Sequence, residues 1–377
     1  MNKKAIVAMS GGVDSSVAAY LMKERGFDCI GVTMKLFENE DVGVSRERGC
    51  CSADDAEDAR SVAYRLGMPF YVFNFAEDFR REVIERFVRA YENGTTPNPC
   101  IDCNRFLKFD RLYRRGRELG FDYTATGHYA RIERDSSRRY LLKKAYDLNK
   151  DQSYVLYAMT QEQLAHTKFP LGELTKPEVR KIAELMPIGD YAKDEVRKIA
   201  EERGFLNAKK RDSQDICFVV NGSYADFIES YTKRALLPGD FVDRCGNVLG
   251  RHRGIARYTV GQRRGLGISF GEALYVCKTD SASNTVTLGR EEELYSKTLT
   301  ADNINLIACE SIERPMRLSA KIRYGQKERS ATVVQTGADE LTVTFDEPQR
   351  AVCAGQALVL YDGDTVVGGG TISGSAR

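Results

Sequence analysis

The feature that most constrains the fold is the stretch Ala5–Ser16, which reads AIVAMSGGVDSS. Ala5–Met9 is an apolar run typical of a buried strand, and Val17–Met22 continues as an apolar run compatible with a helix. The stretch therefore predicts a strand, a glycine turn and a helix in succession. Such a turn places backbone N–H groups at a helix N-terminus, where partial positive charge favours an anion. We expect a phosphate group to bind there.

The side chains of the turn also fit a nucleotide. Gly11 and Gly12 have no Cβ, so a phosphate can approach the main chain closely, and the hydroxyls of Ser10 and Ser15 can donate hydrogen bonds to it. Asp14 does not bind phosphate directly and is expected to hold magnesium. The turn lacks the lysine of a GxxxxGK[ST] loop. The pattern SGGxDS resembles the pyrophosphatase loop (PP-loop) of the ATP-pyrophosphatase superfamily, whose members split ATP into AMP and pyrophosphate.

Composition limits the classes of protein that remain. The 377 residues are enough for two or three domains, and 42% hydrophobic with 29% charged residues is an ordinary globular profile. No apolar run approaches the ~20 residues of a membrane span, and the N-terminus runs straight into the glycine turn, so we expect a cytoplasmic protein without a membrane anchor. A net charge of +2 means that any polyanion site is a local patch.

The order of the expected elements indicates the fold class. Apolar runs at 5–9, 29–37, 68–75 and 122–128 alternate with helical segments, which predicts an α/β fold with a doubly wound parallel sheet of the adenine nucleotide alpha hydrolase-like, PP-loop type. From Leu274 onward six short strand-like segments predict a C-terminal β-barrel. They lie at 274–279, 285–288, 317–324, 330–336, 341–345 and 357–360. We expect three domains: an ATP-binding catalytic domain at 1–165, a small central domain at 166–270 and the barrel at 271–377.

Three of the ten cysteines attract attention. The loop Asn93–Asn104 carries Cys100 and Cys103 in a C-x-x-C pair, followed by an expected helix at Arg105–Leu119. Cys103 is expected at the start of that helix, where the thiolate is favoured. Half of a zinc site is the alternative, but no second C-x-x-C or histidine pair follows. Cys217, within an apolar run, is by itself typical of a buried strand.

Several polar segments have two interpretations each. The cluster Lys150–Tyr154 suits RNA contacts, but Asp151 or Ser153 could simply cap a helix. His128 could contact a base or be a satisfied loop histidine. Arg257, Arg263 and Arg264 among glycines suit a phosphate backbone or form a solvated turn. The sequence EVRKIAE occurs at both 178–184 and 195–201, which indicates a local duplication that adds one helix at 187–203.

Taken together, the motifs resemble one family. They are SGGVDSS (10–16), TPNPCIDCN (96–104), ATGHYAR (125–131), DSQDICF (212–218) and TVGQRRGLG (259–267). In this order they resemble the tRNA-specific 2-thiouridylases, which place sulfur on the wobble uridine of certain tRNAs. The resemblance covers nearly the whole chain.

The resemblance implies a nucleotide site and a reaction. The residues that would bind ATP are Ala8, Met9, Ser10, Gly11, Gly12, Val13, Asp14 and Ser15, with Met34 and Gly127 framing the adenine and ribose and Asp14 helping to hold Mg²⁺. The C2 oxygen of a flipped-out uridine attacks the α-phosphate and pyrophosphate leaves. Cys217 then carries a persulfide received from a sulfur-donor protein, and Cys103 is the nucleophile that completes the exchange through a transient disulfide with Cys217.

The resemblance also implies the contacts with RNA. Asn98, Pro99 and position 100 match residues that hold the target base. The matches to other tRNA contacts are His128, Lys150, Asp151, Gln152, Arg323, Tyr324 and Gln356. The implied partners are a tRNA with a wobble uridine and a sulfur donor, with no membrane; the oligomeric state is left open.

This chain departs from the family pattern at three places. Cys100 replaces an aspartate of many relatives, and the thiolates of Cys100, Cys103 and Cys217 could hold a [4Fe–4S] cluster with one open iron that binds hydrosulfide. Delivery by a relay protein and delivery by hydrosulfide therefore stay open. Asp215 stands where many relatives have glycine and should raise the pKa of the Cys217 thiol. The extra helix at 187–203 has no family counterpart.

Two other functions are compatible with part of the sequence. Another ATP-pyrophosphatase, such as a small-molecule amide synthetase, would explain the glycine turn but not the cysteines. A non-catalytic RNA-binding protein with a relic nucleotide loop would explain the basic segments, but not an intact Ser10 and Asp14 together with Cys103 and Cys217.

Overall fold

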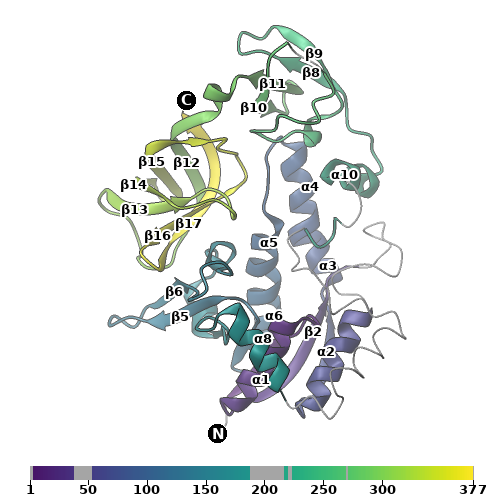
Figure 1. Ribbon diagram of the computed structural model, residues 1–377, viewed down its shortest axis with the longest axis vertical. Helices are drawn as coiled ribbons and strands as arrows, with labels where there is room; N and C mark the ends of the chain where they lie inside the picture. The colour runs from purple at the N-terminus through teal and green to yellow at the C-terminus, as the bar shows by residue number, and fades with distance from the viewer. Residues whose placement is uncertain (1–2, 38–52, 187–215, 220–222, 269–270, 377) are drawn as a thin grey trace.

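The computed structural model describes residues 3–37, 53–186, 216–219, 223–268 and 271–376. The extra helix at 187–203 and Asp215 lie outside these residues. The chain forms a parallel α/β sheet with its helices, a smaller central sheet and a C-terminal barrel; the barrel and the central sheet both lie above the parallel sheet in Figure 1. Among the described residues, every helix is too short or too polar to cross a membrane.

The first unit is a five-stranded parallel sheet in the order β3-β2-β1-β4-β7. The strands are β1 (Lys4–Ala8), β2 (Asp28–Lys35), β3 (Phe70–Asn74), β4 (Tyr123–Ala125) and β7 (Thr167–Lys168). β1 pairs in parallel with β2 on one side and with β4 on the other, so the chain order reverses beside β1. In such sheets ligands bind beyond the carboxyl ends of the strands at this reversal.

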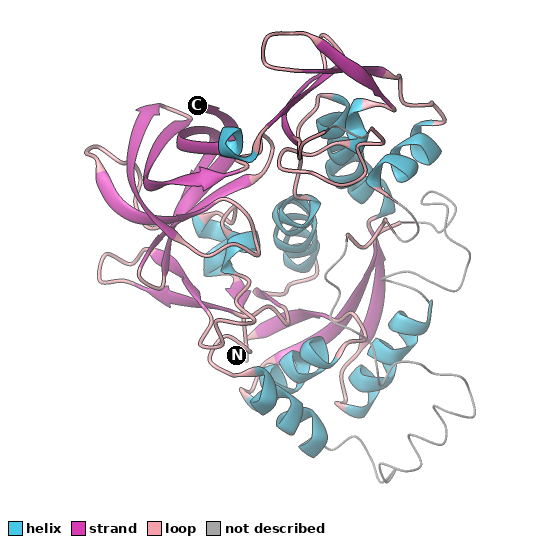
Figure 2. Cartoon of the chain, turned by 45° about the horizontal axis from the view of Figure 1, so that its top comes forward, coloured by secondary structure: helices cyan, strands magenta, loops and turns pink. Residues whose placement is uncertain are grey.

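Side chains of β1 alternate between the two faces of the sheet, as a strand requires. Ala5 and Val7 pack into one core with residues of α1 (Val13–Glu24) and α2 (Ala53–Arg65). Ile6 packs into the opposite core, which the two long helices described next also line. Helices on both faces bury the sheet, which confirms the doubly wound α/β class, and Figure 2 shows the helices around the strands.

Two long helices with π-helical segments cover the second face. The first runs through α3 (Ala76–Phe79), η1 (Arg80–Ile84) and α4 (Glu85–Glu92), and the second through α5 (Pro99–Asp102), η2 (Cys103–Arg111) and α6 (Leu112–Glu118). The second helix thus begins at Pro99, not near Arg105. Cys103 therefore lies in the second turn and not at the helix start, where the effect of the helix dipole on a thiol is strongest.

A smaller antiparallel and parallel sheet lies between the other two units along the chain. Its order is β10-β11-β8-β9, with β8 (Gly239–Val242), β9 (Val248–His252), β10 (Tyr275–Asp280) and β11 (Thr285–Gly289). The strand segments expected at 274–279 and 285–288 as the start of the barrel therefore belong to this central sheet. The reason is pairing: Phe241 of β8 lies opposite Val286 of β11, and both are buried in one core.

The C-terminal barrel is closed by six strands. They are β12 (Tyr295–Leu306), β13 (Met316–Lys321), β14 (Arg329–Gly337), β15 (Glu340–Arg350), β16 (Ala357–Asp362) and β17 (Thr365–Ala376), and β12 pairs with β17 to close the ring. The predicted barrel is confirmed, although sequence patterning missed β12 and β17. β17 is rich in glycine and therefore shows little apolar alternation.

A hairpin from the first unit extends the barrel. β5 (Ala130–Arg134) and β6 (Tyr140–Lys144) follow β4, and β6 pairs with β17 through Thr365 and Val366. Arg131, whose side chain is 12% exposed, donates to the carboxylates of Glu133 and Asp364 and to the carbonyl of Lys144. The pairing of β6 with β17, which we call the seam, thus makes the hairpin part of the hydrogen-bonded sheet of the barrel.

We expect Arg131→Ala to lower the free energy of unfolding by about 1–3 kcal/mol, because it removes two charge-assisted hydrogen bonds and one bond to a carbonyl, while Lys143 remains as the other partner of both carboxylates. Urea denaturation measures this loss. Arg60→Ala is the control: Arg60 and Glu57 form a pair that is 56% and 67% exposed, so its loss is expected to stay within about 0.5 kcal/mol. Equal losses in the two variants would show that the seam adds no stability.

Candidate functional site

The glycine turn follows β1 and opens α1 at the carboxyl edge of the sheet. Gly12 is the N-cap residue of α1, and no side chain among the described residues caps the first turn. The Ser15 hydroxyl instead donates to the Gly12 carbonyl at 2.9 Å and accepts from the Ser10 N–H at 3.2 Å, so the turn is held from within. A helix N-terminus that no side chain caps is suited to an anion.

Two glycines are required by close approach of other segments. Gly11 has φ +72°, and a Cβ there would lie 2.6 Å from the carbonyl oxygen of Asp55 on α2. A Cβ on Gly127, after β4, would lie 2.9 Å from the backbone of Asp14 and of Ser15. The end of β4 is therefore in backbone contact with residues 10–16 (the phosphate turn), and contact of Gly127 with the nucleoside stays a prediction.

Asp14 is partly exposed and held by two neighbours. Lys176 Nζ lies 2.7 Å from both carboxylate oxygens, and the Tyr129 hydroxyl donates to Oδ1 at 2.9 Å. Magnesium is commonly bound by one or two carboxylates together with the phosphates of the substrate. A single carboxylate at the mouth of the phosphate turn fits that arrangement.

The remaining nucleotide-site predictions lie at the same edge. Met34, near the end of β2, is 9% exposed and packs in the core with Ile6. Met9 is buried on the opposite face; its N–H donates to the carbonyl of Val32 and its carbonyl accepts from Thr33. These two hydrogen bonds of the Met9 main chain fix the start of the glycine turn beside β2. Contact of these residues with adenine or ribose stays a prediction.

The first turns of the second long helix carry the cysteine pair. The Asn98 side chain caps this helix by accepting from the Cys100 N–H at 3.2 Å, and Pro99 occupies its first position, as both residue types prefer. Cys100 is exposed and Cys103 is buried. Burial raises the pKa of Asp102, which lies between them, to about 6, against the opposing effect of Arg86 and Arg105.

The loop before this helix is clamped by the other two units. From the barrel end, Gln356 Nε2 donates to the carbonyls of Thr96 at 2.8 Å and Pro97 at 3.4 Å. The Thr96 N–H donates to Ala354 at 2.9 Å, and Thr279 of the central sheet donates to Gly94. The main chain before Asn98 is therefore fixed by all three units.

The segment with Cys217 reaches the same core as Cys103. Phe218 is 1% exposed and its ring contacts those of Phe79, Phe87 and Phe227 at centroid distances of 5.2–5.7 Å. Burial of such a ring contributes about 1.5–3 kcal/mol, which anchors the segment. Cys103 belongs to this hydrophobic cluster and Cys217 packs against it. The two cysteines, far apart in sequence, thus border one core.

The structure gives no support to an iron–sulfur cluster. Within the described ranges, which include Cys100, Cys103 and Cys217, no group of three or more histidine, cysteine, aspartate or glutamate side chains is arranged to hold a metal ion.

His128 is a neutral, packed histidine. Its ring lies 5.8 Å from Phe109 and 5.9 Å from Phe169, and Nδ1 hydrogen-bonds with the Thr126 hydroxyl at 2.7 Å. Burial, aided by the Lys108 cation, keeps the pKa of His128 well below its usual range. An uncharged imidazole can pair with a base edge but does not attract phosphate.

Two of the residues predicted to contact RNA at 150–152 also form hydrogen bonds within the protein. Asp151 accepts from the N–H groups of Ala145 and Ser153 and from the Ser153 hydroxyl, and burial raises the pKa of its carboxyl. Gln152 accepts from the Tyr129 N–H at 3.0 Å. A short helix does begin here, at Ser153, but its N-cap residue is Gln152, without a side-chain capping bond, so the predicted cap at Asp151 or Ser153 is wrong. An RNA contact of these residues stays a prediction.

Tyr324 joins the barrel to the first unit, and Arg323 joins the barrel to the central unit. Tyr324 is 46% exposed, its hydroxyl donates to the carbonyl of Asp151 at 3.3 Å, and its ring lies 5.9 Å from that of Tyr154. Burial raises the pKa of Tyr324, with Asp151 and Cys100 adding to the effect, so these predicted contacts lie near one another. Arg323 instead donates to the carbonyls of Val260 and Ala351 and to the sulfur of Cys353.

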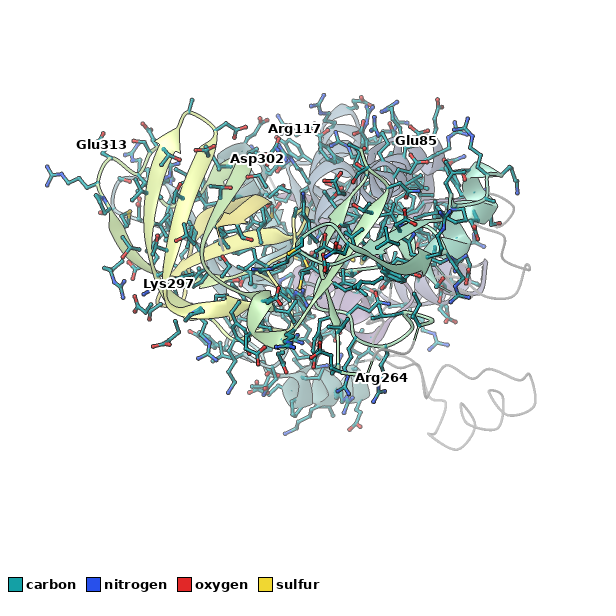
Figure 3. All side chains as sticks on the ribbon, turned by 90° about the horizontal axis from the view of Figure 1, so that it is seen from above. Glu85, Arg117, Arg264, Lys297, Asp302 and Glu313 are labelled. Atoms are coloured by element: carbon teal, nitrogen blue, oxygen red, sulfur yellow. The ribbon has the colours of Figure 1, made fainter. Side chains whose placement is uncertain are left out.

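The three arginines predicted to suit a phosphate backbone, at 257, 263 and 264, differ in their partners and exposure. The guanidinium of Arg257 forms ion pairs with Asp226 and Glu229, so its charge is already neutralised within the protein. Arg263 and Arg264 are exposed, and Arg264 lies at the periphery of the molecule in Figure 3. Only the latter two match the expectation of a site open to a phosphate backbone.

Sequence reasoning missed Tyr129 and Lys176, although both contact Asp14. Tyr129 is part of the ATGHYAR motif at 125–131, directly after His128. Lys176 opens α8 (Lys176–Leu185), next to the capping box of Thr175 and Glu178. The capping pattern predicts the helix start but gives no sign that the lysine points toward the glycine turn.

The fold and the site define the class. A parallel sheet with an order reversal beside β1, a glycine turn at a helix N-terminus and a close glycine after β4 are features of a nucleotide-binding α/β enzyme with a PP-loop. Three family models match along the chain: "tRNA methyl transferase HUP domain" at residues 3–185 and 183–221, "tRNA methyl transferase PRC-barrel domain" at 225–290, and "Aminomethyltransferase beta-barrel domain" at 296–372.

Curated relatives identify the family. The protein called tRNA-specific 2-thiouridylase MnmA in Clostridioides difficile is 51% identical over 376 residues, covering 100% of this chain and 99% of the relative. Those of Acetivibrio thermocellus and Clostridium acetobutylicum are 50% and 48% identical, covering 98% and 99% of this chain and 99% and 100% of the relatives. The chain belongs to the tRNA-specific 2-thiouridylase family.

We expect Gly127→Ala to weaken ATP binding by about tenfold or more, because an added Cβ at 2.9 Å from the backbone of the phosphate turn must displace it. Isothermal titration with ATP and Mg²⁺ in the absence of tRNA measures the affinity. Gly271→Ala is the control, since its Cβ would meet nothing within 4 Å. Unchanged affinity in Gly127→Ala would separate Gly127 from the nucleotide site.

Proposed function

We propose that this protein is a tRNA-uridine 2-sulfurtransferase. It uses ATP to activate the C2 oxygen of the wobble uridine and replaces that oxygen with sulfur, giving 2-thiouridine, AMP and pyrophosphate. Family membership over the full chain supports the reaction. The single structural observation that carries it is that Cys103 and Cys217 border one hydrophobic core on the sheet that bears the phosphate turn.

Activation comes first because a uracil carbonyl oxygen cannot depart unaided. The C2 oxygen attacks the α-phosphorus, the bond between the α- and β-phosphates breaks, and pyrophosphate leaves. We assign the binding of ATP to residues 8–15 with Met34 and Gly127, supported by the approach of Gly127 to the turn. Mg²⁺, when held by Asp14, supplies neutralising charge to the phosphates.

Sulfur transfer follows on the adenylated base. The terminal sulfur of a persulfide on Cys217 attacks C2, and the C2–O bond breaks so that the oxygen leaves as part of AMP. The Cys103 thiolate then attacks Sγ of Cys217, which breaks the bond between the two sulfurs of the persulfide and leaves C2=S on the base. The product disulfide between Cys103 and Cys217 is reduced by an external dithiol, which returns both thiols.

The target base and the tRNA are assigned to the surface around the clamped loop. We infer that Asn98, Pro99 and Cys100 hold the flipped-out uridine, and that Lys150 and Tyr324 contact the tRNA nearby. His128 supplies an uncharged ring. Asp151, Gln152, Arg323 and Gln356 are already hydrogen-bonded within the protein, so their proposed effect on tRNA is mainly to fix the loops that touch it.

Each of the three units is assigned its own part in the reaction. We assign catalysis and ATP binding to residues 1–165, and RNA contacts and Cys217 to residues 166–270. The barrel within 271–377 is assigned to docking of tRNA, with β10 and β11 counted with the central sheet by their pairing. A relay protein supplies the sulfur: the Cys217 thiolate attacks the outer sulfur of the donor's persulfide, and the donor leaves as a thiol. The proposed place of action is the cytoplasm, where cysteines stay reduced.

The two rival functions are not favoured. A small-molecule amide synthetase has no use for two cysteines at one core, and its release of pyrophosphate would depend on a carboxylate substrate and not on tRNA. A non-catalytic RNA-binding protein has no need for the close fit of Gly127 to the phosphate turn. Nucleoside mass spectrometry of tRNA from cells that lack the protein distinguishes the proposal from both rivals: loss of 2-thiouridine supports the proposal, and unchanged 2-thiouridine contradicts it.

Cys217→Ser is expected to abolish formation of 2-thiouridine while tRNA-dependent release of pyrophosphate continues, because adenylation precedes sulfur attack. Mass spectrometry of nucleosides and a pyrophosphate assay measure the two steps on the same samples. Cys245→Ser is the matched control, since Cys245 is an exposed thiol in the turn between β8 and β9.

Two results would contradict this assignment. Loss of pyrophosphate release in Cys217→Ser would show that the order of steps is wrong. Thiolation at the normal rate would show that Cys217 does not carry the sulfur. Cys245→Ser is expected to retain both activities.

A further inference from the structure

Lys176 brings a positive charge to the phosphate turn from a distant part of the chain. The turn 10–16 has no lysine or arginine of its own. Lys176 Nζ lies 2.7 Å from Oδ1 and 2.7 Å from Oδ2 of Asp14, and the lysine side chain is only 12% exposed. A lysine that is mostly buried and directed at one carboxylate of a ligand turn differs from an exposed surface ion pair.

The position of Lys176 is fixed by its surroundings. The Glu178 side chain accepts from the Thr175 N–H at 2.7 Å in a capping box, and Asp147 accepts from the Lys176 N–H at 3.0 Å. α8 then packs along α1, where Val179 shares a buried cluster with Val17 and Ala18. Helix α8, which begins at Lys176, therefore packs against α1, which begins at the phosphate turn.

The charges explain why a lysine is needed there. The carboxylate of Asp14 alone would repel a triphosphate that arrives at the helix N-terminus. The ammonium of Lys176 cancels that charge, and the hydroxyl of Tyr129 fixes the carboxylate from the other side. A lysine ammonium is also a common ligand of phosphate oxygens.

We propose that Lys176 binds the β- and γ-phosphates of ATP, so that α8 supplies the lysine that a GxxxxGK[ST] loop carries within itself. The inference rests on the proposed function, since it assumes ATP on the turn. In the ligand-free chain the ammonium holds Asp14. With ATP and Mg²⁺ present, Asp14 is shared with the ion and the ammonium bonds to the oxygens that leave as pyrophosphate.

The test compares two nucleotides that differ in these phosphates. Isothermal titration without tRNA measures the dissociation constants of ATP and of AMP, each with Mg²⁺, for the wild type and for Lys176→Met. We expect the constant for ATP to rise about tenfold or more, because a charge-assisted hydrogen bond is lost, while that for AMP changes less than twofold. Lys176→Arg should recover most of the affinity for ATP.

Lys181→Met is the matched control, because Lys181 is an exposed lysine on the same helix; it should bind both nucleotides as the wild type does. Unchanged or tighter binding of ATP by Lys176→Met would overturn the inference, and so would an equal loss for ATP and AMP, which indicates a merely structural role. Selective loss for ATP supports it. If the wild type binds ATP in this way but forms no 2-thiouridine, the proposed function fails and the inference on Lys176 stands.

Discussion

The arrangement of the site depends on a few hydrogen bonds to the main chain of one short loop. Residues 94–97 receive donors from Gln356 at the end of the barrel and from Thr279 on the central sheet, and Thr96 returns an N–H to Ala354. Bonds to the main chain fix a path independently of the side chains that the loop presents. Asn98 and the cysteine pair follow directly, so their position depends on the assembly of all three units.

Much of the catalytic unit could be predicted because its signals are local. The apolar run, the glycine turn and the following helix at 5–22 define a strand, a phosphate site and a helix without reference to the rest of the chain. The parallel sheet followed from the alternation of such elements. The helix start near Cys103 was misplaced because Asn98 and Pro99, a cap and a first-turn proline, were interpreted as loop residues.

The parts that could not be predicted depend on contacts between distant segments. Nothing in the sequence near Lys176 indicates that its ammonium meets Asp14. Strands β10 and β11 alternate as barrel strands do, and only their pairing with β8 assigns them to another sheet. The common core beside Cys103 and Cys217 depends on Phe218, whose apolar neighbours along the chain suggested only an ordinary buried strand.

The pairing of β6 with β17 has a consequence for how a large substrate is received. These hydrogen bonds make the hairpin of β5 and β6 part of the barrel's sheet, while the short segment 126–129 joins the same hairpin to β4 of the parallel sheet. A folded RNA that touches both units therefore meets two surfaces that are joined through this hairpin, and the placement of the hairpin limits which bends of the RNA can reach both.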